Sequence, residues 1–123
     1  MADEFKRLLS AKFSRDNTVT EFGTRSDASY TYATQKRTLK NFTATTSWVA
    51  LDFDTLSDAD ELWISNLDAT NYVRLAIAND DTKIFSRIKP GNRPIAFTPE
   101  PGQTWYIKAN TASCKCVLFA VEP

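Results

Sequence analysis

Short runs rich in apolar and β-branched residues alternate with turn residues along most of the chain. Val73, Leu75 and Ile77 alternate with Arg74 and Ala76, which is typical of a strand with one buried face. From about residue 60, turn signals recur at intervals close to the roughly 8–12 residues typical of antiparallel sandwiches and barrels. The expected strands lie at residues 28–34, 38–45, 48–53, 62–67, 72–77, 82–88, 94–97, 104–109 and 114–121. The pattern therefore predicts an all-β domain of eight or nine strands.

Two segments, residues 89–92 and 100–103, carry the strongest turn signals. Each has a proline where a tight turn needs φ near about −65°, followed by a glycine where a type II turn needs positive φ. The residues expected to form these turns are Pro90, Gly91, Pro101 and Gly102.

The run at residues 114–121 is apolar on both faces. Cys114, Cys116 and Leu118 would point one way, and Val117 and Phe119 the other. Such a strand is expected at the centre of a sheet, covered on both sides. Because aromatic residues make up 12% of the chain, two packed sheets could be filled. The pattern favours an antiparallel two-sheet sandwich of jelly-roll type.

The first 27 residues are harder to interpret. One face of a helix with Asp3 as its N-cap would collect Ala2, Phe5, Leu8, Leu9 and Phe13. One side of a strand would instead collect Phe5, Leu9, Ala11 and Phe13. Residues 14–28 are mostly polar and are expected to form a loop or linker. We therefore divide the chain into an N-terminal arm or short helix with a loop, residues 1–27, and a β-sandwich domain, residues 28–123.

Formal charge is zero overall but unevenly distributed. Residues 1–45 carry eight bases and five acids, residues 46–70 carry six acids and no base, and residues 71–123 carry seven bases and four acids. A neutral chain does not favour binding to nucleic acid or to a membrane surface. No apolar run approaches the length of a signal-peptide core, so we expect the protein to be made and to stay in a cytoplasm unless lysis releases it.

Complementary charges suggest association with copies of the chain or with a fixed partner. We expect two contact surfaces, called here the acidic band and the basic arm. The acidic band comprises Asp52, Asp54, Asp58 and Asp60, and the basic arm comprises Lys6, Arg7, Lys12 and Arg15. The alternative interpretation is that the acids lie in solvated loops.

Little in the sequence indicates catalysis. The chain contains no histidine, which excludes Ser-His-Asp, Cys-His and histidine-metal sites. Cys114 and Cys116 lie two apart in an apolar run and are expected to be buried, reduced side chains. The pair Asp52 and Asp54 could act as two catalytic acids, but solvated edge charges are the commoner case. We expect no enzymatic activity, no cofactor and no metal site.

Two further clusters could bind a ligand. A stacking platform for sugars or bases could be formed by Trp48, Trp63 and Trp105 with Tyr30, Tyr32, Tyr72 and Tyr106, although aromatic residues in strands more often fill a core or an interface. The basic residues at 35–40 could contact a nucleic-acid backbone, but a charged strand edge that prevents sheet-to-sheet pairing is the better interpretation.

The C-terminal half carries a resemblance to a known class of proteins. The segments concerned are NLDATNYV at 66–73, IKPG at 88–91, PG at 101–102, WYIKA at 105–109 and LFAVE at 118–122. In these segments the chain resembles small β-sandwich or jelly-roll structural proteins of tailed-bacteriophage virions, some of which coat or cement the capsid. The resemblance covers about half the chain and carries no catalytic residue.

The resemblance implies a virion structural protein that binds and stabilises the capsid lattice, as a cement, decoration or minor capsid protein. The implied partners are the major capsid protein and copies of the chain itself, as a dimer or trimer. The N-terminal stretch would then reach a neighbouring subunit. The alternative function is a carbohydrate-binding β-sandwich of a tail or fibre protein that contacts the host surface.

Overall fold

The computed structural model describes residues 36–54 and 56–122, together with the backbone of four strands that precede them. The chain divides into two compact units, residues 1–35 and residues 36–123. The boundary lies eight residues after the one expected from the sequence. The described residues contain no helix long and apolar enough to cross a membrane.

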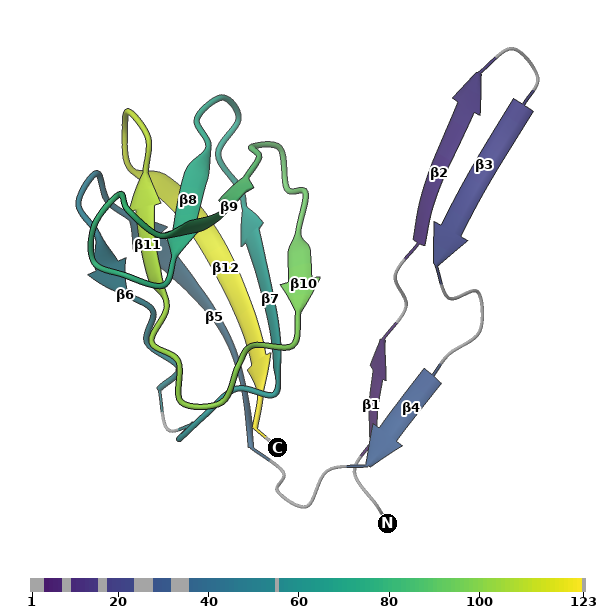
Figure 1. The fold of residues 1–123 in the computed structure, drawn as a ribbon, viewed down its shortest axis with the longest axis horizontal. Helices are drawn as coiled ribbons and strands as arrows, with labels where there is room; N and C mark the ends of the chain where they lie inside the picture. Colours follow the sequence, from purple (N-terminus) through teal and green to yellow (C-terminus); the bar gives the residue numbers. More distant parts are fainter. Residues whose placement is uncertain are drawn as a thin grey trace. The chain divides into compact units, whose positions relative to one another are not determined.

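The N-terminal unit consists of two antiparallel strand pairs (Figure 1). Strands β2 (Ser10–Arg15) and β3 (Thr18–Gly23) pair with each other, and β1 (Glu4–Arg7) pairs with β4 (Ala28–Thr31). Of the two alternatives for the first residues, the structure therefore has the extended one. Residues 18–23, expected in a loop, form β3, because the threonines and valine of this polar stretch suit a strand once a partner is available.

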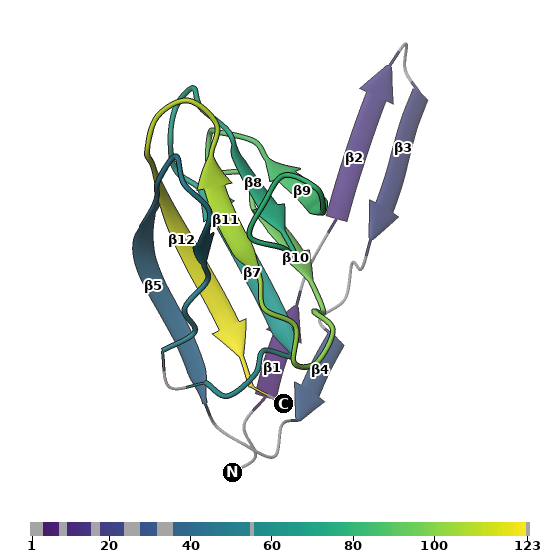
Figure 2. The same ribbon diagram turned by 60° about the vertical axis from the view of Figure 1, so that its left-hand side comes forward.

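The second unit contains eight strands in two antiparallel sheets (Figures 1 and 2). The first sheet has the order β10-β7-β12-β5 and the second the order β6-β11-β8-β9. The strands are β5 (Arg37–Ala44), β6 (Val49–Ala50), β7 (Glu61–Asn66), β8 (Val73–Ala76), β9 (Ile84–Ile88), β10 (Ile95–Phe97), β11 (Tyr106–Ala109) and β12 (Cys114–Val121). The prediction of an all-β, two-sheet domain is confirmed.

The strand pairing is nested. The first strand of this unit pairs with the last, β5 with β12, and the next strands inward pair in the same way: β6 with β11, β7 with β10, and β8 with β9. The chain is therefore one long antiparallel hairpin that has been wound into two sheets. Most of these pairs join strands far apart in the sequence.

The core lies between the two sheets. The first sheet contributes Leu62, Ile64 and Leu118, and the second contributes Val73 and Leu75, all of them fully buried. Their alternation along each strand places them on the inner faces. Strand β12 pairs with β5 on one side and β7 on the other, which confirms its expected central position.

One lateral side of the sandwich is closed by aromatic rings. Phe85 of β9, Phe97 of β10 and Trp105 have mutual centroid distances of 5.1–5.2 Å. Edge-to-face and tilted contacts at this spacing are favourable. The opposite lateral side, between the edge strands β5 and β6, has no such closure among the described residues.

The two proline-glycine turns have the backbone geometry that their sequence requires. The φ angle is +88° at Gly91 and +74° at Gly102. In the second turn, the Gln103 N–H donates a hydrogen bond to the Glu100 carbonyl at 3.3 Å. In the first, the Gly91 N–H donates to the Asp68 carbonyl at 2.8 Å, which ties this turn to the loop after β7.

Candidate interaction surfaces

Two acids of the acidic band converge on one lysine of the edge strand β5. Lys40 Nζ lies 3.0 Å from Asp54 Oδ1 and 3.7 Å from Asp52 Oδ2. The Thr38 hydroxyl donates a hydrogen bond to the other oxygen of Asp54 at 2.8 Å. Asp52 remains 78% exposed at its side chain, so it is the acid of this group most accessible to a partner.

Asp54 has an unusual backbone conformation, with φ of +57°. Its N–H donates to Asp52 Oδ1 at 2.9 Å, the kind of local bond that lets an aspartate adopt the left-handed region. The hydrogen bond from Lys40, and then that from Thr38, lower the pKa of the Asp54 carboxyl. The Asp54 carboxylate thus binds Lys40 and Thr38 of its own chain.

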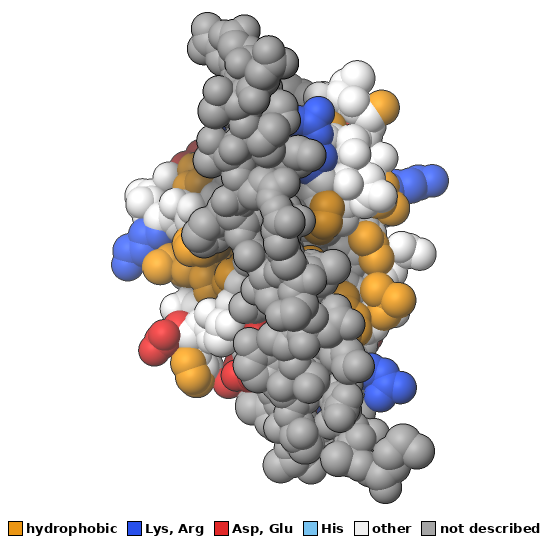
Figure 3. All heavy atoms as spheres, turned by 90° about the vertical axis from the view of Figure 1, so that its right-hand side faces the viewer, with side chains coloured by type: hydrophobic (Ala, Val, Ile, Leu, Met, Phe, Trp, Pro, Cys, Tyr) orange, Lys and Arg blue, Asp and Glu red, His pale blue; other side chains and the backbone are white. Residues whose placement is uncertain are grey.

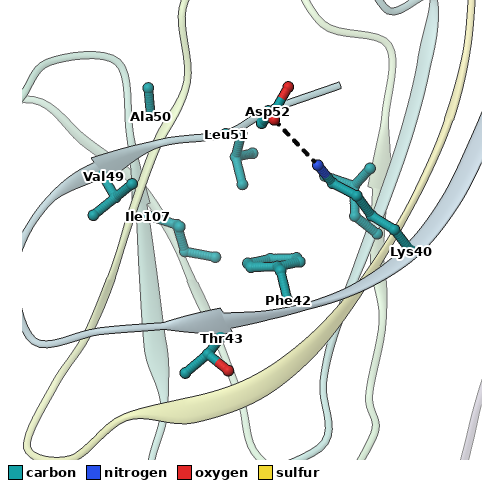
Figure 4. A pocket seen from close by; sticks show the side chains of 9 residues that line it. Lys40, Phe42, Thr43, Val49, Ala50, Leu51, Asp52 and Ile107 are labelled. Carbon is teal, nitrogen blue, oxygen red and sulfur yellow. Dashed lines mark ion pairs between the residues drawn. The ribbon is translucent and has the colours of Figure 1, made fainter. Parts of the chain in front are cut away.

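A cavity of about 180 Å³ lies beside these acids, on the open lateral side of the sandwich. Phe42, Leu51 and Ile107 project into it, and Lys40 reaches toward Asp52 at its rim (Figure 4). The lining comes from β5, from β6 and the segment after it, and from β11 and β12. Because the two sheets are not bridged here, the hydrophobic interior is partly accessible.

Asp58 and Asp60 make different contacts. Asp58 Oδ2 accepts a hydrogen bond from the Gly102 N–H at 3.2 Å, so this acid stabilises the turn at residues 100–103. The Asp60 N–H donates to the Val121 carbonyl at 2.7 Å, which holds Asp60 beside the end of β12. Of the four acids, only Asp52 and Asp54 share a partner side chain in the described part of the chain, namely Lys40.

The basic arm lies in the N-terminal strands. Lys6 and Arg7 belong to β1, and Lys12 and Arg15 belong to β2. Their side chains lie outside the described residues.

The three tryptophans do not gather into a platform. Trp105 is 5% exposed and packs in the core. Trp63 lies in β7 of the first sheet, whereas Trp48 precedes β6 of the second. A stacking surface built from all three, as considered from the sequence, is not formed.

Both cysteines are free and fully buried, as expected. Burial raises the pKa of the Cys114 thiol and raises that of Cys116 to about 12. A thiol with such a pKa carries almost no thiolate at neutral pH and is a poor nucleophile.

The structure also forms a cluster that the sequence did not reveal, called here the cationic row. It consists of Lys108 of β11, Arg74 of β8 and Arg87 of β9. Lys108 is the register partner of Arg74, and Arg74 is the register partner of Arg87. The residues on both sides of Arg74 and of Lys108 are buried, as is Ile88 next to Arg87, so the row lies on the outer face of the second sheet.

Aromatic side chains hold the cationic row in place. The guanidinium carbons of Arg74 and Arg87 lie 5.5 and 5.4 Å from the centre of the Tyr72 ring. Arg74 Nη2 also donates to the Tyr72 hydroxyl at 3.0 Å. Lys108 Nζ lies 5.7 Å from the Trp48 ring centre. These distances are typical of cation–π contacts, which retain the positive charge while restricting the side chain.

One carboxylate accompanies the row. Asp81 Oδ1 lies 3.7 Å from Lys108 Nζ and accepts a hydrogen bond from Trp48 Nε1 at 2.8 Å. Within residues 36–54 and 56–122, no carboxylate forms an ion pair with Arg74 or Arg87. The two arginines therefore retain positive charge that no described carboxylate compensates. Such like charges directly opposite each other on neighbouring strands are unfavourable.

The surface of the described residues is otherwise mixed. In the space-filling view, exposed hydrophobic side chains lie among separate basic and acidic groups (Figure 3). Leu39 of β5 is the most exposed large hydrophobic residue among them, at 72%. No group of three or more Cys, Asp or Glu side chains in the described part of the chain is placed to hold a metal ion.

Comparison with protein-family models, with curated proteins and with solved structures finds no match to this chain.

Proposed function

We propose that this chain is a virion structural protein that binds and stabilises a capsid lattice through protein–protein contacts, as a cement, decoration or minor capsid protein. Its partners would be the major capsid protein and other copies of the chain. It would be assembled in the host cytoplasm and act in the virion, without catalysing a reaction.

The nested strand pairing is the observation that carries the proposal. Eight strands that pair β5·β12, β6·β11, β7·β10 and β8·β9 in two four-stranded sheets support a jelly-roll arrangement, an architecture common in viral capsid domains. The same architecture also occurs in lectin domains. Fold does not determine function, so the surfaces must distinguish the two.

The surfaces favour association with protein. The tryptophans that a sugar-stacking site would need lie on separate parts of the domain. Exposed charge of both signs is present instead, at Asp52 and along the cationic row. In a symmetric lattice, many modest contacts of this kind add up to stable attachment.

Particle association tests the proposal. Particles purified by density gradient from cells that make this protein should contain the chain, and washing with buffer of higher ionic strength should release it. Recovery of the chain in the soluble fractions alone would contradict the proposal.

A charge reversal locates the contact. Asp52→Lys should weaken retention on the particles about tenfold, because Asp52 is the most accessible acid beside Lys40. Glu100→Lys makes the same charge change at an exposed residue outside the acidic band and should leave retention unchanged. Equal effects of both variants would indicate dependence on net charge rather than on a defined contact.

A further inference from the structure

We propose that the cationic row binds the acidic band of a second copy of this chain, with Asp52 as its central contact. This inference names a partner surface within the proposed association function, and it was not reached from the sequence, which paired the acidic band with the basic arm. The row is Lys108, Arg74 and Arg87.

Electrostatics within one copy support this assignment. Arg74 and Arg87 face each other across neighbouring strands without a carboxylate partner in the described part of the chain. On the acidic side, Asp52 is 78% exposed and its distance to Lys40 is the long one, 3.7 Å. Each surface thus has charge that residues 36–54 and 56–122 leave largely uncompensated, and opposite charges on one neutral chain favour contact between copies.

The construction of the row is suited to a protein interface. Tyr72 orients both arginines and Trp48 lies beside Lys108. Arginine, tyrosine and tryptophan are the residues that most often dominate interface energetics. Because the two guanidinium groups are already held by one ring, less side-chain freedom is lost when a carboxylate binds.

The position of the row also selects the kind of contact. It crosses the outer face of the second sheet, whereas an extended peptide normally adds to a sheet edge. Asp52 follows the edge strand β6 on the open lateral side. The contact therefore joins two different patches, either reciprocally about a twofold axis in a dimer or from copy to copy in a ring or chain.

The first test is sedimentation velocity of the purified full chain. At low ionic strength the sedimentation coefficient should rise with protein concentration, and it should return to that of a monomer as salt is added. Arg87→Glu and Asp52→Lys should each weaken self-association at least tenfold. Arg93→Glu, which reverses an exposed arginine outside the row, should associate as the unmodified chain does.

Mixing the two defective variants gives a sharper test. Arg87→Glu retains an intact acidic band, and Asp52→Lys retains an intact cationic row. An equimolar mixture should therefore associate again, because each intact surface finds its partner on the other variant and the two reversed charges also attract each other. A mixture that stays monomeric would overturn the inference.

Three other outcomes would also overturn it. The basic arm would be the partner if Lys12→Glu with Arg15→Glu abolishes self-association while Arg87→Glu does not. The row would serve an anionic glycan if Arg87→Glu leaves sedimentation unchanged but abolishes retention on a sulfated-polysaccharide column. A chain that is monomeric at all concentrations and still binds particles would remove this inference alone and leave the proposed function standing.

Asp81→Asn is expected to strengthen self-association, whereas the variants above weaken it. Asparagine keeps the oxygen that accepts the hydrogen bond from Trp48 but removes the one carboxylate paired with Lys108. Self-association should become several-fold stronger, because the row gains net positive charge. Weaker association would contradict the assignment of the row as the cationic partner.

Discussion

At the scale of single residues, Gly102 and Asp54 each combine an unusual backbone angle with a contact to a side chain. Gly102 has φ of +74° and its N–H donates to Asp58, while Asp54 has φ of +57° and binds Lys40 and Thr38. The glycine is needed for its conformation, whereas the aspartate is needed for its carboxylate. Asp54 holds its loop against β5, whereas the Gly102 bond joins two loops.

Gly102→Val should lower the free energy of unfolding by about 1–3 kcal/mol, because a β-branched residue resists positive φ. No atom lies within 4 Å of the position that a Cβ would occupy, so the loss would report backbone strain rather than a steric clash. Urea denaturation measures it. Gly102→Asn should cost less, since asparagine tolerates the left-handed region. A valine variant as stable as the unmodified chain would exclude a conformational requirement at this turn.

Asp54 should make stability depend on pH. Its pKa is lowered in the folded state, chiefly by the hydrogen bond from Lys40. A lowered pKa contributes stability above the ordinary aspartate pKa, and this contribution is lost as the pH falls through the folded value. Denaturation at neutral and acidic pH should show Asp54→Asn less stable than the unmodified chain at pH 7, with the difference shrinking in acid.

A double-mutant cycle checks the cause of that dependence. In a Lys40→Met background, Asp54→Asn should have a much smaller effect at pH 7, because the two side chains contribute through their contact. Equal effects with and without Lys40 would assign the shift to other groups.

At the scale of elements, the sequence predicted where strands lie along the chain better than it predicted which strands pair with each other. The run at 114–121 was placed correctly to the residue and at the centre of a sheet, because it is apolar on both faces. The strand at residues 28–31 was assigned to the sandwich but pairs with β1, since tyrosine and threonine favour any strand equally. The cationic row was missed because its members meet only through the register of three separate strands.

The edge strand β5 offers a prediction at this scale. Lys40 lies on the same face of β5 as Phe42 and Ala44, and a charge turned inward on an edge strand discourages pairing with another sheet. Lys40→Val should increase the rate of aggregation several-fold, measured by light scattering at a temperature where the domain remains folded. Lys115→Val, on the central strand β12, is the matched control and should aggregate more slowly. Equal rates would show that Lys40 does not protect the edge.

At the scale of the whole molecule, the chain joins two units of different character. Residues 36–123 have a core shared by two sheets, whereas the described backbone of residues 1–35 forms two strand pairs. Net charge and composition predicted a neutral associating protein, but they could not locate the contacts. The contacts depend on which charged side chains lack a partner within the fold. The arrangement of both sheets determines which side chains these are.

The stoichiometry of the chain in purified particles tests the central claim most directly. A protein that attaches to a symmetric lattice occupies equivalent positions, so quantitative mass spectrometry should find it in a fixed, small-integer ratio to the major particle protein, unchanged by repeated gradient purification. A ratio that varies between preparations, or falls toward zero with each purification, would contradict the account.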